Sequence, residues 1–181
     1  MRSPGSDRLS DNRSVHVVVR LPKIADAEGL ARASQDLATQ YADVEPERFH
    51  VPAFEETVDW LREAIQKPLA EDSVWLVADL DGEAVGDAKA LLHDPMSNAG
   101  IQPQLDVGRR RAYLGWLAVQ SAHRSHGIGG RLLTAIEAWA LEQGAELITT
   151  DTNLRSNLGA VEFYERNGYV RQAVILRKEL R

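Results

Sequence analysis

The chain of 181 residues contains no cysteine. Because disulfides, thiolate zinc sites and cysteine nucleophiles all require that side chain, the composition excludes these three chemistries. The chain also lacks any apolar run of about eighteen residues, the length at which a segment becomes a candidate for a membrane-spanning helix. We therefore expect no membrane partner and a cytoplasmic location.

Positive charge is scarce as well. The sequence has 21 Lys and Arg against 27 Asp and Glu, which gives a net charge of -6. Nucleic-acid-binding domains carry an excess of positive charge, so we expect no nucleic-acid partner. The length and the 44% apolar content suit one domain with a single core. Residues 1–14 are polar and lack the apolar stretch of a secretory signal, so we expect a flexible N-terminal tail followed by one domain over residues 15–181.

The hydrophobic pattern alternates between that of strands and that of helices. Apolar or β-branched runs predict strands at residues 15–19, 73–80, 84–92, 112–119, 146–150 and 169–180. Helical spacing predicts four helices, which begin near Asp26 (as N-cap), Phe54, Gly127 and Ser156. The dipeptide Asp81-Gly82 predicts a tight hairpin. This order predicts an α/β fold with a mixed sheet, in which residues 112–119 form a central strand covered on both faces.

The most informative segment is LAVQSAHRSHGIGGRLL, residues 117–133. Here an apolar strand is expected to meet a helix through a turn that contains Gly127, Gly129 and Gly130. The free N–H groups and the dipole of a helix N-terminus favour anions, and glycine lets the backbone approach phosphate oxygens closely. Arg124 and Arg131 add positive charge. The segment therefore predicts a phosphate site.

Two common nucleotide-binding turns do not match this spacing. A Walker loop requires a Gly-Lys pair, and none occurs in the chain. A dinucleotide-binding loop requires a third glycine or alanine where Leu132 stands, and it follows parallel strands rather than the hairpin expected here.

The hexapeptide Arg124-Ser125-His126-Gly127-Ile128-Gly129 resembles the signature of the GNAT superfamily of acyl-CoA-dependent N-acetyltransferases, which is Arg or Gln, two residues, Gly, one residue, then Gly or Ala. The resemblance extends over residues 112–169 and includes Asn157, Ala160, Phe163-Tyr164 and Gly168-Tyr169. It implies a mixed central sheet of six or seven strands flanked by about four helices, with acetyl-CoA as co-substrate.

The resemblance also implies roles for individual residues. Leu117, Ala118 and Val119 would lie beside the pantetheine arm, and Val119 would donate its N–H to the thioester oxygen. The pyrophosphate would be held by Arg124, Ser125, His126, Gly127, Ile128, Gly129 and Gly130. Asn157 would contact the arm farther along. Tyr164 would give its proton to the leaving thiolate, although an aromatic residue that only packs on the sheet would fit the same position.

The group that deprotonates the acceptor amine stays open. Some members of the superfamily carry a carboxylate on the strand before the turn, where this chain has Tyr113 and Trp116. Asp87, His93 or a chain of water molecules are the alternatives. His123 and His126 lack a third ligand nearby in sequence, so we expect no metal site.

The resulting hypothesis is an enzyme that transfers an acetyl group from acetyl-CoA to a primary amine of a small molecule or peptide. A non-catalytic acyl-CoA-binding or sensing domain of the same fold is the alternative. A purely structural interaction module would have no use for an open glycine turn. The sequence leaves open whether the protein forms a homodimer.

Overall fold

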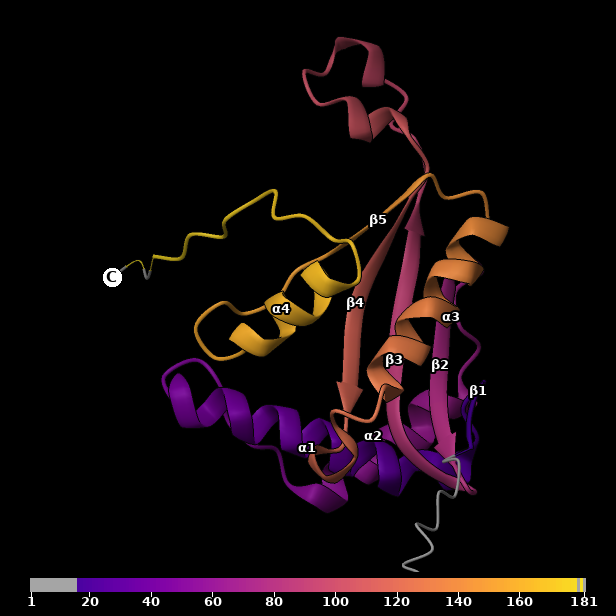
Figure 1. Cartoon of the computed structure of the whole chain (residues 1–181), viewed down its shortest axis with the longest axis vertical. Coiled ribbons are helices and arrows are strands. Elements are labelled where there is room, and N and C mark those ends of the chain that lie inside the picture. Colours follow the sequence, from indigo (N-terminus) through magenta and orange to yellow (C-terminus); the bar gives the residue numbers. More distant parts are fainter. Residues whose placement is uncertain (1–15, 179, 181) are drawn as a thin grey trace, which may run out of the picture.

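The computed structural model describes residues 16–178 and 180, and it has a five-stranded sheet in the order β1-β2-β3-β4-β5 (Figure 1). The strands are β1 (Val17–Arg20), β2 (Ser73–Leu80), β3 (Glu83–His93), β4 (Arg111–Val119) and β5 (Leu147–Thr150). The first four pair antiparallel, and β5 lies parallel to β4. The predicted α/β fold with a mixed sheet is confirmed.

Helices cover both faces of this sheet. α1 (Ala27–Val44) and α2 (Phe54–Gln66) pack on one face, where they share a core with Trp75, Val77 and Ala84. α3 (Ile128–Glu142) packs on the other face with α4 (Leu158–Arg166) beside it. The four predicted helices are therefore present. None of the described helices is long and apolar enough to cross a bilayer.

The hairpin between β2 and β3 forms where the sequence predicts it. Asp81 and Gly82 both have positive φ angles, 51° and 95°, which a two-residue turn of this kind requires. Gly82 N–H donates to the Asp79 carboxylate at 2.7 Å, which closes the turn.

Asp26 precedes α1 as predicted, but its carboxylate does not cap that helix. Instead it accepts two hydrogen bonds from the Arg20 guanidinium, at 2.7 and 2.8 Å, and one from Lys23 N–H at 2.6 Å. Arg20 also donates to Asp79 at 2.8 Å. This cluster ties β1, β2 and the start of α1 together.

The expected closing strand at residues 169–180 is wrong, and so is the count of six or seven strands. Residues 169–178 form neither helix nor strand, and Val174, Ile175 and Leu176 are exposed. A strand needs a partner for its N–H and C=O groups, and within the described residues no strand pairs with the outer edge of β5. Apolar composition alone therefore does not add a strand here. The predicted tail, residues 1–14, lies outside the described residues.

Candidate functional site

Strand β4 is paired with a neighbouring strand along both of its edges only in its first half. Its pairing with β5 ends at Leu114, which lies opposite Thr150. The register with β3 then skips Gly115, because Lys89 pairs with Trp116 and Ala90 with Leu114. Such a bulge bends a strand and increases its twist. As a result β4 and β5 separate toward the end of β4 (Figure 1), which leaves this half of the strand with an open edge. The sequence predicts that both faces of this strand are covered, and Leu114, Ala118 and Val119 are buried, whereas Gly115 is exposed.

The second half of β4 directs backbone groups toward this opening. Gln120 N–H donates to the Val85 carbonyl of β3 at 2.9 Å. Because neighbouring residues of an antiparallel strand alternate in direction, the N–H and C=O groups of Val119 and Leu117 point away from β3. The Val119 carbonyl indeed accepts a hydrogen bond from Arg124 Nε at 2.9 Å. Ala118, by contrast, is aligned with Asp87 of β3 and directs its backbone groups toward that strand.

The turn after β4 leaves the start of α3 open. Gly127, the residue before the helix, has a φ of 79°, and Ser125 has a φ of 64°. No side chain of the described chain caps this end of α3. A Cβ atom added at Gly127 or Gly130 would meet no atom within 4 Å. The first N–H groups of the helix therefore face free space, which suits an anionic group.

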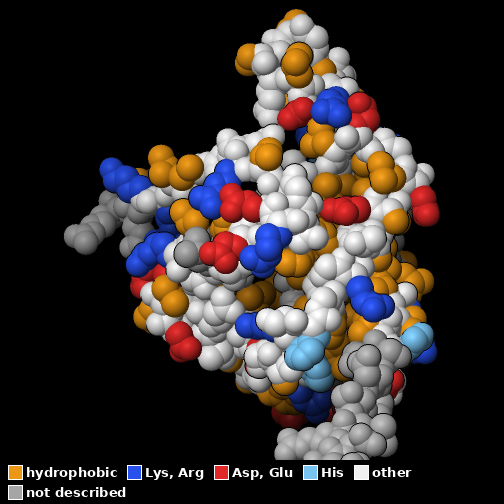
Figure 2. All heavy atoms as spheres, viewed as in Figure 1, with side chains coloured by type: hydrophobic (Ala, Val, Ile, Leu, Met, Phe, Trp, Pro, Cys, Tyr) orange, Lys and Arg blue, Asp and Glu red, His pale blue; other side chains and the backbone are white. Residues whose placement is uncertain are grey.

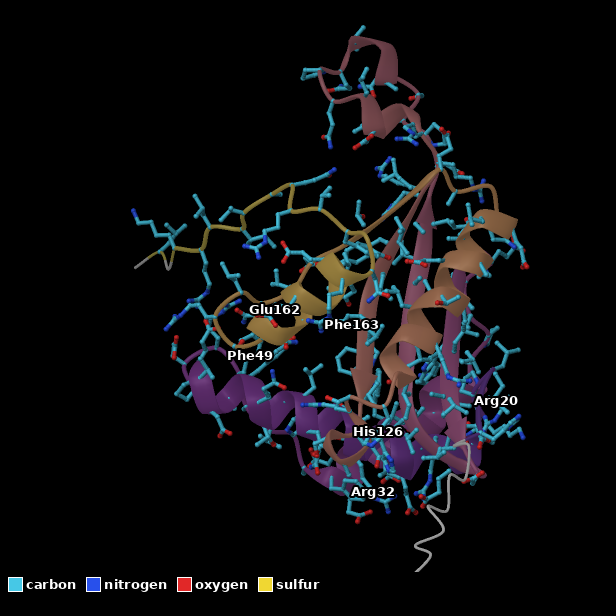
Figure 3. All side chains as sticks on the ribbon, viewed as in Figure 1. Arg20, Arg32, Phe49, His126, Glu162 and Phe163 are labelled. Atoms are coloured by element: carbon cyan, nitrogen blue, oxygen red, sulfur yellow. The ribbon has the colours of Figure 1, made fainter. Side chains whose placement is uncertain are left out.

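The side chains of the turn divide between core and surface. Ile128 is buried, so it anchors the turn and only its backbone can reach a ligand. A Cβ at Gly129 would lie 3.6 Å from Phe163 and 3.8 Å from Leu117. His126 is exposed at the turn, and Phe163 lies on α4 (Figure 3). Figure 2 shows this face hollowed between α3 and α4, with hydrophobic atoms inside the hollow.

Arg124 belongs to a polar network that joins three elements. Its Nη1 donates to Gln40 Oε1 of α1 at 2.9 Å. Gln40 Nε2 in turn donates to the Ser156 carbonyl at 3.0 Å and to Asn157 Oδ1 at 3.1 Å. Asn157 Nδ2 donates to the Tyr41 hydroxyl at 3.3 Å. The network holds α1, the turn and the start of α4 together. Both the oxygen and the nitrogen of the Asn157 side-chain amide have a hydrogen-bond partner in it.

The positive charges near the turn have no carboxylate partner within the described chain. Arg124 is bound by the neutral groups described above, and Arg131 donates to the Val17 carbonyl at 3.4 Å. Both guanidinium groups therefore keep their positive charge available to an anion near the turn.

Tyr164 of α4 lies close to the point where β4 and β5 separate. Burial raises the pKa of its hydroxyl above the usual value, although a hydrogen bond with the Thr150 hydroxyl acts in the opposite direction. Thr150 Oγ1 itself donates to the Leu114 carbonyl at 2.9 Å. The phenol is therefore protonated at neutral pH and lies beside the opening. Its ring also packs on Phe163 and Tyr169, with centroid distances of 5.2 and 5.3 Å.

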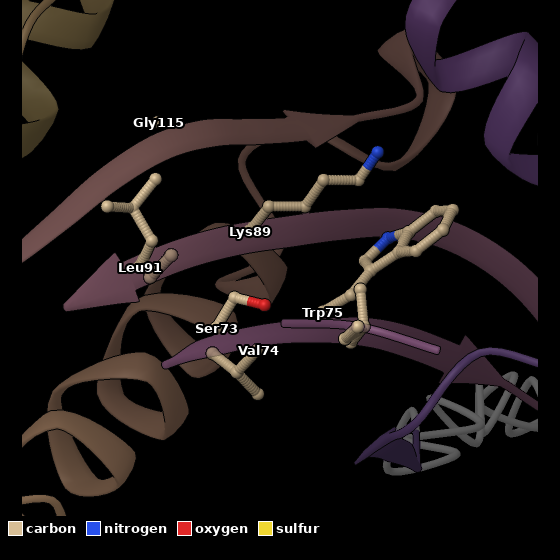
Figure 4. Close-up of a pocket in the computed structure, with 8 residues that line it drawn as sticks. Ser73, Val74, Trp75, Lys89, Leu91 and Gly115 are labelled. Atoms are coloured by element: carbon tan, nitrogen blue, oxygen red, sulfur yellow. The ribbon is translucent and has the colours of Figure 1, made fainter. Parts of the chain in front are cut away.

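The α1 and α2 face of the sheet holds a cluster that sequence reasoning did not place. Asp87 is buried in β3, and its two oxygens accept hydrogen bonds from the indole N–H groups of Trp75 and Trp116, both at 2.8 Å. Lys89, two residues along, places Nζ 3.8 Å from the centroid of the Trp75 ring. Figure 4 shows Lys89 and Trp75 on neighbouring strands. Alternation along β3 is the only sequence signal that puts Asp87 and Lys89 on one face.

The remaining candidate side chains lie outside the Asp87 cluster. His93 is exposed at the far end of β3, with its ring centroid 6.5 Å from that of Tyr113. The Tyr113 hydroxyl donates to Asp151, which raises the pKa of Tyr113 to about 12. Across the described part of the chain, no three His, Asp or Glu side chains are grouped so that they could hold a metal ion.

Comparison with known families agrees with this geometry. The profile described as "Acetyltransferase (GNAT) family" matches residues 34–169, well over half of the chain. This chain belongs to the GNAT acetyltransferase family. The match begins within α1 and ends just after α4, so it includes the opening of β4, the turn and Tyr164.

Individual relatives support the same fold. The uncharacterized N-acetyltransferase YhfO of Bacillus subtilis (strain 168) is 35% identical over 99 residues, which cover 54% of this GNAT chain and 59% of the relative. The alignment thus spans less than two thirds of that protein. A mutant of the BH1408 protein from Bacillus halodurans has a TM-score of 0.75 at 20% identity, with 90% of this chain and 99% of that one covered. The aminoglycoside N-acetyltransferase AAC(6')-Iy in complex with CoA has a TM-score of 0.60 at 17% identity, with 94% and 98% covered.

Proposed function

We propose that this protein is an acyl-CoA-dependent N-acyltransferase that transfers the acetyl group of acetyl-CoA to a primary amine of a small molecule or peptide. The observation that supports it most is the continuous path from the open edge of β4 to the uncapped start of α3. That path offers extended backbone groups first and helix N–H groups next, an arrangement that matches an amide-containing arm followed by a pyrophosphate.

The residues along this path suit different parts of acetyl-CoA. Leu117 and Val119 would pair with the pantetheine arm through backbone groups, with Ala118 between them. The pyrophosphate would lie on the amides of residues 125–130, with Arg124 contributing charge. Asn157 would contact the arm only if its side-chain amide gave up its hydrogen bond to Gln40 or to Tyr41. A GNAT-fold aminoglycoside N-acetyltransferase whose structure contains CoA is consistent with such a site.

The chemistry needs a donor to the thioester oxygen and a proton for the departing sulfur. The acceptor ammonium would first lose one proton to solvent; the amine nitrogen would then bond to the acetyl carbon and lose a second proton, which restores Tyr164, while the bond from the acetyl carbon to sulfur breaks. Val119 N–H points into the opening, where it would donate a hydrogen bond to the thioester oxygen. Tyr164 would protonate the sulfur, since a phenol with a raised pKa holds its proton until that charge develops.

Isothermal titration with acetyl-CoA tests the site directly. The substitution Gly129→Glu would direct a carboxylate from the turn toward Phe163 and Leu117, where it would repel the pyrophosphate and obstruct the arm, and we expect it to weaken binding by about a hundred-fold or more. Gly129→Ala is the matched control, because its Cβ would make only ordinary contacts with Phe163 and Leu117. It should bind within about three-fold of the parent. If the parent protein binds no acetyl-CoA, the proposal fails.

A second function, acyl-CoA sensing without turnover, is favoured by one observation. β4 carries no carboxylate, and Tyr113 and Trp116 stand at the positions where some members of the family have one. Thiol release from acetyl-CoA in the presence of a panel of primary amines separates the two functions. Saturable, amine-dependent release supports the transferase, and tight binding without release for any amine supports the sensor.

A further inference from the structure

Asp87 is a buried carboxylate whose acceptor capacity is only partly used. It is 3% exposed, and each oxygen accepts one indole N–H. An ionised carboxylate offers about four acceptor positions, so each oxygen can accept one more hydrogen bond. Burial raises the pKa of this carboxyl, while Lys89 and the two indoles act to lower it. A buried acid that faces a pocket is a candidate for ligand contact.

A pocket of about 250 Å³ opens beside this carboxylate, between α1, α2 and the sheet. Its walls include Leu30, Leu61, Trp60 and Trp116, together with Asp87. Trp60 is 59% exposed, which makes it an aromatic surface at the rim. Pockets for drug-sized ligands have volumes of about 300–1,000 Å³. This pocket therefore suits a smaller molecule with a flat or apolar body.

Lys89 sets a limit on the charge of that molecule. Its ammonium lies 3.8 Å from the Trp75 ring centroid and 5.4 Å from that of Trp60, and the side chain lines the pocket. A ligand with one ammonium group can place it on Asp87. Lys89 already interacts with Asp87, and the described lining residues include no other carboxylate, so a second ammonium group would meet only repulsion from Lys89 in a partly buried region.

Trp116 connects this pocket to the opening of β4. It lies next to Leu117 in sequence, and successive side chains of a strand point to opposite faces. The pocket on one face of β4 and the start of α3 on the other therefore share the same short stretch of strand. An acceptor in the pocket would therefore lie against the strand whose open edge is proposed to carry the acetyl group.

We infer that this pocket receives the acceptor, a small primary monoamine with a flat apolar body, whose ammonium group binds Asp87 and whose body lies against Trp60 and Trp116. The inference rests on the proposed function and names its substrate class. It disfavours polycationic acceptors such as aminoglycosides, although proteins of that activity share the fold.

Binding without acetyl-CoA tests the inference apart from turnover. Three of the four tryptophans, Trp60, Trp75 and Trp116, belong to this cluster, so tryptophan fluorescence can follow ligand binding. We expect the full chain to bind 2-phenylethylamine about ten-fold or more tightly than 2-phenylethanol, spermidine or tobramycin. Saturating acetyl-CoA should leave this order unchanged in a thiol-release assay.

The variants separate ligand contact from a structural role. Asp87→Asn should abolish the preference for the amine over the alcohol and keep the affinity for acetyl-CoA, a selective change that general loosening of the sheet would not produce. Lys89→Met should improve spermidine binding several-fold, and Trp60→Leu should weaken both aromatic ligands. Asp59→Asn, an exposed carboxylate on α2, is the matched control and should change nothing.

Three outcomes would overturn the inference. The first is equal binding of monoamine and polyamine by the parent protein. The second is an unchanged preference for the amine over the alcohol in Asp87→Asn. If that variant does not fold, the corresponding result is unchanged binding of both aromatic ligands by Trp60→Leu together with unchanged spermidine binding by Lys89→Met. The third is a loss of amine binding in Asp151→Asn but not in Asp87→Asn, which would place the ammonium at the Tyr113–Asp151 pair instead. Failure to bind acetyl-CoA would overturn the proposed function itself.

Discussion

The two faces of the sheet offer different kinds of groups to a ligand. On the α3 face, the candidate site consists mainly of backbone N–H and C=O groups from residues 117–130. On the α1 and α2 face, the candidate acceptor pocket consists of side chains from β3, β4 and both helices. Backbone groups suit a cofactor that is the same in every member of a family. Side chains can change one at a time, so they suit an acceptor that differs between members.

The two faces also depend differently on the rest of the fold. The turn needs a few residues with left-handed backbone angles and a helix that follows them. The pocket needs α1 and α2 held at a set distance from the sheet, which the Arg20 cluster and the apolar core beneath α1 both serve. We therefore expect substitutions in distant residues to disturb amine binding more often than acetyl-CoA binding.

Replacement of Arg20 by methionine should have the largest effect on stability. It leaves the carboxylate of Asp26, which is 5% exposed, without its cationic partner. Loss of one partner of a buried ion pair destabilises by about 3 kcal/mol, which urea unfolding would measure. Arg62→Met is the control, because its ion pairs with Glu28 and Asp59 are exposed. A loss below about 1 kcal/mol in Arg20→Met would show that the cluster does not hold α1 in place.

Removal of the Tyr164 hydroxyl should affect turnover and little else. We expect Tyr164→Phe to lower kcat by about a hundred-fold, the lower range for loss of a general acid, with the acetyl-CoA affinity unchanged. Tyr169→Phe is the matched control, because this neighbouring ring donates its hydroxyl to Glu137 at 3.2 Å. Equal kcat in Tyr164→Phe and the parent protein would assign Tyr164 to packing alone.

Asp26 and Asp87 predict opposite dependences of stability on pH. Burial acts to raise the pKa of Asp26, but hydrogen bonds from Arg20 and Lys23 outweigh it and lower the pKa below 3.8. Ionised Asp26 therefore stabilises the folded protein above pH 3.8, and this stabilisation is lost as the pH falls through the folded-state pKa of Asp26. The pKa of Asp87 is raised above 3.8, with Lys89 the charged group that faces it. Its protonated form is favoured in the folded state, so stability falls as the pH rises from 3.8 toward the folded-state pKa.

Urea unfolding between about pH 2 and 7 measures how the free energy of unfolding depends on each carboxyl group. In Asp87→Asn the decrease in stability on raising the pH should disappear, whereas in Asp26→Asn the loss of stability at acid pH should shrink. The same pH profile in Asp87→Asn and the parent protein would contradict the raised pKa.

The smallest effect should come from the network that links the two faces at the turn. Gln40→Leu removes the side chain that joins Arg124 to Asn157, and we expect acetyl-CoA affinity to fall by about three-fold. Gln35→Leu, on the same helix, removes a hydrogen bond to the Pro52 carbonyl and should leave the affinity unchanged. A matching loss in both variants would mean that α1 acts through general stability and not through the turn.

The features that the sequence predicts well are those formed by neighbouring residues. Asp81-Gly82 specifies its hairpin because few other residues adopt two consecutive positive φ angles. The segment from Arg124 to Gly129 combines its spacing with the helix that follows, so both the turn and the family can be inferred from it. Four helices also follow from apolar spacing within single segments.

The other features depend on contacts between distant segments. Residues 169–178 have the composition of a strand, but pairing requires a partner edge, and composition does not supply one. The sequence places Asp87 in a hairpin strand, but it does not show whether the carboxylate is exposed or buried. Only the folded sheet places the indoles of Trp75 and Trp116, 12 and 29 residues away, on its two oxygens. Local backbone preferences therefore determine the turn, whereas the burial and charge of Asp87 were decided by tertiary packing, because desolvation depends on all the neighbours at once.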